Sequence, residues 1–289
     1  MVSAIGPSSQ IPNLQSTIDN PMHPDRIAEL LEPFLGHSPT GTGRRPEIPR
    51  HSETASAAQE SAVLSSTQLQ SISTYIDLML HWNSRINLTS VRQPEEIVTR
   101  HFGESLFAAR HLFSEQIAWG QPPRAVPAGQ GPAERTSSRL HVIDIGSGAG
   151  FPGLPIKIWA PHIHLTLIES TLKKAIFLRE VIRKLTLANV DVFTGSAGDF
   201  GKGSRDDRKR ASPEVKADIV TLRAVERFES ILPTAVQLVA RAGRLAILVG
   251  QKQADRVRTL VPDLNWSEPA KLPLSVGRVV IIGRNEPRS

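Results

Sequence analysis

Residues 140–153 read Leu-His-Val-Ile-Asp-Ile-Gly-Ser-Gly-Ala-Gly-Phe-Pro-Gly, and this stretch decides the fold. The apolar run up to Ile145 predicts a short buried strand, and residues from about 153 to 159 predict a helix. Glycines between a strand and a helix allow positive φ angles and let the backbone pass close to a ligand. The segment therefore predicts a strand–turn–helix unit whose turn binds a ligand.

Beyond this turn, predicted strands and helices alternate along the chain. Strands are expected at residues 163–168, 190–193, 217–222 and 244–249, and helices at 172–187, 227–240 and 254–260. Such alternation predicts an α/β fold, a mainly parallel sheet with helices on both faces. Two last strands, at 271–274 and 278–283, have a connection too short for parallel neighbours. They predict an antiparallel hairpin at the sheet edge and bring the sheet to seven strands.

Before the sheet, the chain is predicted to contain an extension, a helical cap and an insert. Residues 1–60 are rich in Ser, Pro, Thr and Gly and predict a poorly structured extension, in which only residues 27–35 suit a turn or two of helix. Apolar spacings of three and four predict a helix at 67–83, followed by helices at about 94–101 and 104–113. We therefore expect a small helical cap over 61–119.

Two inserts are expected. Residues 120–138 are rich in Pro, Gly and Ala and predict a linker or insert before a ligand-binding domain over 139–285. Residues 201–216 carry many charges and predict a second insert within that domain.

The composition excludes several classes of protein. The 289 residues include no cysteine, which excludes a disulfide scaffold, a thiolate zinc site and a cysteine nucleophile. There is no run of about 18 apolar residues and no secretory leader, so we expect a cytoplasmic protein without a membrane partner.

The charge is unevenly distributed. The net charge is +6, but residues 1–60 carry −3 and residues 61–289 carry +9. A basic excess in the part expected to fold favours a polyanionic partner, and a generic basic surface explains it about equally well.

Two classes of ligand fit the glycine-rich turn. Residues 148–153 match G-x-G-x-x-G, the fingerprint of a dinucleotide whose pyrophosphate lies at a helix N-terminus. That register places Pro152, which has no N–H, in the phosphate-facing turn. The other register, Asp144-x-Gly146-x-Gly148-x-Gly150, has an acid at the strand end and suits a cationic ligand such as S-adenosylmethionine. Glu169, at the end of the second strand, suits the ribose hydroxyls of either ligand.

Four motifs together resemble a known family. They are Trp82-Asn83 with Asn87-Leu88-Thr89-Ser90, Arg100-His101 with Glu104-Ser105, the turn from Asp144 to Gly153, and Arg223-Ala224. The chain resembles the class I S-adenosylmethionine-dependent methyltransferases. More narrowly, it resembles the bacterial 16S ribosomal RNA guanine-N7 methyltransferase G family, also called glucose-inhibited division protein B. The resemblance covers about residues 67–283 without the inserts and implies a Rossmann-like fold.

The resemblance implies a set of cofactor-binding residues: Gly146, Gly148, Phe151, Glu169, Ala197, Gly198 and Arg223. Three positions depart from the family pattern. The adenine segment is Ser196-Ala197-Gly198-Asp199, without the usual preceding arginine and internal acid. Val249, with Lys252 nearby, replaces a frequent lysine at the end of the fifth strand, and Glu104 replaces an aspartate.

The implied reaction is methyl transfer to N7 of a guanine in small-subunit ribosomal RNA. Because N7 has a lone pair and no proton, no general base is needed, and we expect no catalytic acid–base residue. Arg100 and His101 are candidates for RNA contacts, or they pin the cap to the sheet. His162 and His164 lack an evident third ligand, so no metal site is expected.

The implied partner is ribosomal RNA or the 30S particle, and the expected state is a monomer. Three alternatives stay open: a methyltransferase of another RNA base or of a protein, an NAD-dependent oxidoreductase, and a non-catalytic RNA-binding relative.

Overall fold

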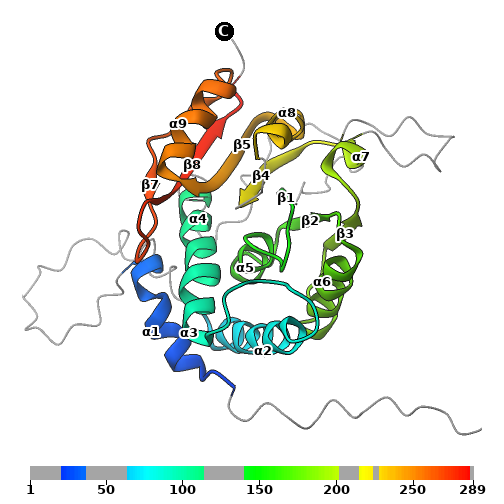
Figure 1. Ribbon diagram of the computed structural model, residues 1–289, viewed down its shortest axis with the longest axis vertical. Coiled ribbons are helices and arrows are strands. Elements are labelled where there is room, and N and C mark those ends of the chain that lie inside the picture. The colour runs from blue at the N-terminus through cyan, green and yellow to red at the C-terminus, as the bar shows by residue number, and fades with distance from the viewer. Residues whose placement is uncertain (1–20, 37–63, 114–139, 202–214, 224–227, 287–289) are drawn as a thin grey trace, which may run out of the picture.

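The computed structural model of the protein describes residues 21–36, 64–113, 140–201, 215–223 and 228–286 (Figure 1). Within these ranges the strands form an eight-stranded sheet of order β3-β2-β1-β4-β5-β8-β6, with β7 also paired to β8. The strands are β1 (His141–Ile145), β2 (His164–Glu169), β3 (Val190–Thr194), β4 (Ala217–Arg223), β5 (Val239–Gly250), β6 (Asn265–Trp266), β7 (Ala270–Lys271) and β8 (Arg278–Arg284).

Strand directions confirm the expected fold class. Strands β1 to β5 are parallel, β8 is antiparallel to β5, and β6 and β7 are antiparallel to β8. The sheet has one strand more than the seven expected, because β6 is only two residues long and leaves no periodic signal. Strand β5 begins at Val239, inside the helix expected at 227–240, since an apolar run of this length fits either structure.

Helices cover both faces of the sheet (Figure 1). On one face lie α5 (Gly153–Trp159) and α6 (Leu172–Lys184), and on the other lie α7 (Ala197–Gly201), α8 (Phe228–Gln237) and α9 (Gln251–Leu260). Side chains alternate between the two cores: Val142 of β1 belongs to the first hydrophobic cluster and Ile143 to the second. The glycine-rich turn emerges between these layers, at the carboxyl end of β1.

The cap contains α1 (Pro24–Leu35), α2 (Ser66–Asn83), α3 (Pro94–Ile97), a π-helical segment η1 (Val98–Gly103) and α4 (Glu104–Phe113). Segments α3, η1 and α4 follow one another without a break, whereas we expected two separate helices. A π-helix is uncommon and is often found at functional sites. Among the described residues, no helix is long and apolar enough to cross a membrane.

Helix α1 corrects the expectation of an unstructured extension over 1–60. Ile27, Leu31 and Phe34 are almost completely buried against α2, η1 and α4. A Cβ atom on Gly103 would lie 2.6 Å from the Phe34 ring, so the absence of a side chain there lets α1 approach η1. The rest of 1–60 lies mostly outside the described residues, as do the insert at 120–138 and most of the insert at 201–216.

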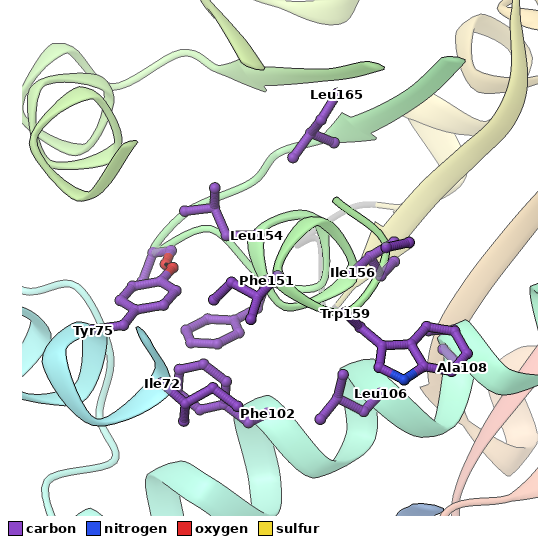
Figure 2. Packing of buried hydrophobic residues seen from close by; sticks show 14 of the residues in the cluster. Ile72, Tyr75, Phe102, Leu106, Ala108, Phe151, Leu154, Ile156, Trp159 and Leu165 are labelled. Carbon is purple, nitrogen blue, oxygen red and sulfur yellow. Dashed lines mark hydrogen bonds between the residues drawn. The ribbon is translucent and has the colours of Figure 1, made fainter. Parts of the chain in front are cut away.

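The cap and the sheet share one hydrophobic core. Figure 2 shows Tyr75 of α2 and Phe102 of η1 gathered around Phe151 of the glycine-rich turn. The rings of Tyr75 and Phe151 are stacked at 5.5 Å, and Phe102 meets Phe151 edge-on at 5.2 Å. Such aromatic pairs stabilise a junction beyond the area that they bury. The cap is therefore built onto the glycine-rich turn.

We expect Leu31→Ala to lower the free energy of unfolding by about 2–5 kcal/mol, since it removes a completely buried side chain. Glu32→Ala, on the exposed face of the same helix, is the matched control and should change it by less than about 0.5 kcal/mol. Urea denaturation measures both values. Equal effects of the two substitutions would show that α1 does not contribute to the shared core.

Candidate active site

The turn after β1 is shaped by three glycines. Gly146, Gly148 and Gly150 have φ angles of 67°, 58° and 92°, a region that side-chain-bearing residues rarely adopt. The N–H groups of Gly146 and Ser147 both donate to the Ile168 carbonyl, at 2.8 and 3.1 Å. The turn is thus bound to the end of β2, and the Phe151–Pro152 peptide bond that follows it is cis.

Asp144 stabilises this turn from the protein interior. Its side chain is completely buried, accepting a hydrogen bond from Thr221 Oγ1 at 2.7 Å and another from the Gly153 N–H at 3.2 Å. Burial raises the pKa of the Asp144 carboxyl from 3.8 to about 6, against these hydrogen bonds, which lower it. Asp144 does not line the cavity described below, so it supports the turn from the protein interior.

Glu169 also bonds to backbone N–H groups. Its two carboxylate oxygens accept from Gly148 N at 2.8 Å and from Thr171 N at 2.7 Å, and the residue is only 5% exposed. It therefore supports the turn directly. It does not line the cavity, and its contact with ribose hydroxyls stays a prediction.

Two glycines of this segment, Gly150 and Gly153, are also required by packing. A Cβ atom on Gly150 would overlap the Tyr75 hydroxyl and Leu154, and one on Gly153 would lie 2.9 Å from Asp144 Oδ2. In the dinucleotide register Gly150 is the glycine that must leave room for a pyrophosphate. Protein atoms fill that space, and the Asp144 carboxylate occupies the helix N-terminus where an anion would bind. The geometry therefore disfavours a dinucleotide.

A cavity of about 670 Å³ lies where the turn, the cap and the ends of β4, β5 and β8 meet. Six of the nine residues predicted to bind the cofactor or RNA line it: Gly146, Gly148, Phe151, Arg223, Arg100 and His101. Ala197, Gly198 and Glu169 do not.

The adenine segment opens α7 instead of lining the cavity. The Ser196 hydroxyl donates to Asp199 Oδ2 at 2.6 Å and accepts from the Asp199 N–H at 3.2 Å. The Asp199 carboxylate is thus already bonded to Ser196. Adenine contacts by Ala197 and Gly198 stay a prediction.

The cavity wall is strongly basic. Among the described residues that line it are four cations and no carboxylate; the cations are Arg100, Lys174, Arg223 and Arg278. Lys174 belongs to the basic face of α6, and Arg278 is a residue that sequence reasoning missed. In the sequence, Arg278 was distinguished only by its position at the start of the last predicted strand.

A buried carboxylate holds two of these arginines. Glu104 of α4 is 1% exposed, and its oxygens accept from Arg223 at 3.1 Å and from Arg278 at 2.9 Å. Burial raises the pKa of the Glu104 carboxyl, while the nearby arginines oppose this rise. Arg223 also donates to the Arg100 carbonyl. The cluster joins the cap to the ends of β4 and β8.

His101 is a neutral member of the wall. Its Nε2 lies 2.9 Å from Thr89 Oγ1, and its ring stacks on Phe151 at 4.8 Å. Burial, followed by the fields of three arginines, lowers the pKa of His101 to about 2. It therefore carries no charge with which to pair with a phosphate. Arg100, by contrast, is half exposed and forms an ion pair with Glu96 at 2.6 Å.

The loop over the cavity, residues 87–91, is held by Asn83. Its side-chain oxygen accepts from the N–H groups of Leu88 and Thr89 at 2.9 and 3.0 Å, and its amide donates to the Thr89 carbonyl. Asn83 stands in the Trp-Asn motif, so the signal was present in the sequence.

These residues fit S-adenosylmethionine. Arg223 Nε and His101 Nδ1 are buried without a hydrogen-bond partner among the described residues, which is costly unless a ligand satisfies them. Arg223 suits the carboxylate of the cofactor, and the open space beside Gly148 leaves room for its atoms. No group of three or more potential metal ligands occurs in the described part of the chain.

Comparisons with known proteins agree with this fit. A model of the family described as "rRNA small subunit methyltransferase G" matches residues 68–119 and 132–273. The protein of that name from Roseiflexus castenholzii is 38% identical over 67% of this chain and 70% of its own length. The one from Bacillus subtilis is 31% identical over 76% of this chain and 83% of its own.

Solved structures are less similar. The crystal structure of M. jannaschii TYW2 in complex with AdoMet is 18% identical, covers 51% of this chain and 68% of its own, and has a TM-score of 0.39.

The raised pKa of Asp144 makes stability depend on pH. The folded protein binds this proton more tightly than the unfolded chain, with pKa values of about 6 and 3.8. The contribution of Asp144 to stability is therefore complete below about pH 4 and is lost as the pH rises through about 6. Relative to Asp144→Asn, the wild type should lose free energy of unfolding between these pH values, as measured by urea denaturation. A difference that stays constant with pH would contradict this.

Proposed function

The chain belongs to the rRNA small subunit methyltransferase G family, and on that premise we propose that it transfers a methyl group from S-adenosylmethionine to N7 of a guanine in 16S ribosomal RNA. The observation that carries the proposal is the shared cavity. One side of it is the glycine-rich turn, and the other is a wall of four cations that suits an RNA strand. Family membership confirms the predicted rRNA methyltransferase class and the predicted cofactor.

The proposed residue roles follow from the geometry. Gly146, Gly148, Phe151 and Arg223 line the inner part of the cavity and bind the cofactor there. Glu169 acts by holding the Gly148 N–H. His101, uncharged and stacked on Phe151, borders the space that the target base enters.

The chemistry needs little from the protein beyond positioning. The cofactor, when bound, would supply a methyl group on a positively charged sulfur. The guanine N7 lone pair would form a bond to that methyl carbon while the carbon–sulfur bond breaks, so that S-adenosylhomocysteine would leave as a neutral thioether and N7-methylguanine would carry the positive charge. Since N7 has no proton to remove, the proposed reaction needs no general base. The chain orients the two reactants, which alone lowers a barrier by several kcal/mol (about 7–11 at best).

Ribosomal RNA is therefore the proposed partner, either free or in the 30S particle. We expect that a strain without this protein lacks one N7-methylguanosine in 16S ribosomal RNA. Mass spectrometry of nuclease fragments from the small-subunit RNA measures this. Wild-type protein should restore the modification and Arg223→Gln should not, because it removes the cavity guanidinium. An unchanged modification map would reject N7 of guanine as the target. A missing modification on another base would favour the alternative methyltransferase.

The cofactor is tested separately. We expect calorimetry to show binding of S-adenosylhomocysteine and no binding of NAD, because Tyr75 and Leu154 fill the space beside Gly150. Tight NAD binding without S-adenosylhomocysteine binding would instead favour the oxidoreductase. If S-adenosylhomocysteine binds but no methyl group reaches small ribosomal subunits, the protein is a non-catalytic relative.

A further inference from the structure

We propose that Arg278 on β8 binds the phosphate backbone of the substrate RNA at the rim of the cavity, and that Glu104 is the positioning residue that holds it there. The inference rests on the proposed function, since it takes RNA as the substrate. It adds a binding residue and a positioning residue that the resemblance does not supply.

Strand pairing brings Arg278 to the cavity. Arg278 lies directly opposite Gly250 in the antiparallel pair of β5 and β8, and Val279 lies opposite Val249. Val249 stands where the family pattern often has a lysine at the end of the fifth strand, and it lines the cavity as an apolar residue. The guanidinium at this end of the sheet comes instead from the neighbouring strand. Residues about 30 positions apart in the sequence thus share one wall.

Glu104 leaves most of the Arg278 guanidinium free. One carboxylate oxygen accepts from Arg278 Nη1 at 2.9 Å, and in the described part of the chain this is the only hydrogen bond of that side chain. A guanidinium has five N–H donors in a planar fork that matches phosphate oxygens. The buried carboxylate therefore fixes the direction of Arg278 while several donors stay available to a ligand.

The two arginines on Glu104 lie at different depths. The Arg223 side chain is 7% exposed and lies 5.8 Å from the centre of the Phe151 ring, so it belongs to the inner, cofactor side. The Arg278 side chain is 23% exposed and borders the opening with Gly250 and Gln253. A strand that presents a base to the cavity passes the outer arginine first.

Charge balance favours RNA as the ligand of Arg278. S-adenosylmethionine carries one carboxylate, one ammonium and one sulfonium, so it is itself a net cation. A single arginine suffices for the carboxylate of the cofactor. The described cavity wall has four cations, and the carboxylates of Glu104 and Glu96, which pair with three of them, balance only two of the four charges. The surplus suits a polyanion, whose phosphates release counterions when arginines neutralise them.

Binding to RNA at several salt concentrations tests the proposal. The probe is the small ribosomal subunit from a strain without this protein, titrated with the S-adenosylhomocysteine complex at about 50–200 mM salt. Arg278→Gln should weaken binding roughly tenfold and reduce the slope of log K against log salt by about 1. Its affinity for S-adenosylhomocysteine should stay within about twofold, since Arg278 lies outside the cofactor side.

Arg241→Gln is the matched control. Arg241 is an exposed arginine near the start of β5, at the end away from the cavity, and it has the same charge. The control should leave RNA binding and the salt slope at wild-type values. The proposal is overturned if Arg278→Gln behaves like the control. It is also overturned if RNA and cofactor affinity fall together, because that pattern indicates general damage to the site.

A double-mutant cycle tests the role of Glu104. If Glu104 acts on RNA through Arg278, the losses of RNA affinity in Glu104→Gln and Arg278→Gln are less than additive in the double variant. Additive losses would remove Glu104 from the proposal. Thermal unfolding identifies any variant that fails to fold, and Glu104→Asp, which keeps the charge, is then used in its place.

The two proposals fail in distinguishable ways. Binding to the small subunit is measured without methyl transfer, so the salt dependence of binding tests the role of Arg278 even if no N7-methylguanosine forms. Methyl transfer by the wild type tests the proposed function, whatever salt slope the Arg278 variant has.

Discussion

The buried carboxylate of Asp144 is the constraint on which the site depends. It accepts from Thr221 on β4 and from the Gly153 N–H at the start of α5, so it fixes β1, its neighbouring strand and its following helix together. Burying a carboxylate away from water costs free energy, which is why the pKa of Asp144 is raised to about 6. The hydrogen bonds from Thr221 and Gly153 offset part of that free energy. The backbone course of the glycines between Asp144 and Gly153 is then fixed at both ends. That path places Gly146 and Gly148 at the cavity.

The cap extends this constraint outward. Tyr75 donates a hydrogen bond to the Ala149 carbonyl within the glycine-rich turn, and Phe151 from the same turn packs into the cap. Because the side chains of the turn pack into the cap, the cap positions the glycine-rich turn and also supplies part of the cavity wall. The π-helical segment belongs to this arrangement, since it carries both Phe102 in the junction and His101 at the cavity.

Prediction from sequence succeeded where a pattern is local and repeated. Strands β1 and β2 are short and mostly apolar, and α2 has apolar residues at regular spacing, so each was expected close to its observed bounds. For α1 the sequence predicted only a turn or two of helix at residues 27–35, because its apolar residues become buried only against the distant η1. Strand β6 was not predicted, because it is two residues long and forms only where β8 offers a free edge. The complete burial of Asp144 was not predicted either, because a strand end by itself does not reveal which way a carboxylate points.

The sequence by itself determined the fold class, the ligand-binding turn and the family, because strand periodicity, glycines at required φ angles and contiguous motifs are all properties of neighbouring residues. Only the tertiary structure decided which residues meet at the cavity. Glu104, Arg223 and Arg278 are separated by more than fifty residues at each step, and no spacing rule links them. They meet because parallel strands end at one edge of the sheet and β8 returns antiparallel beside β5, so a buried acid on the cap reaches both arginines.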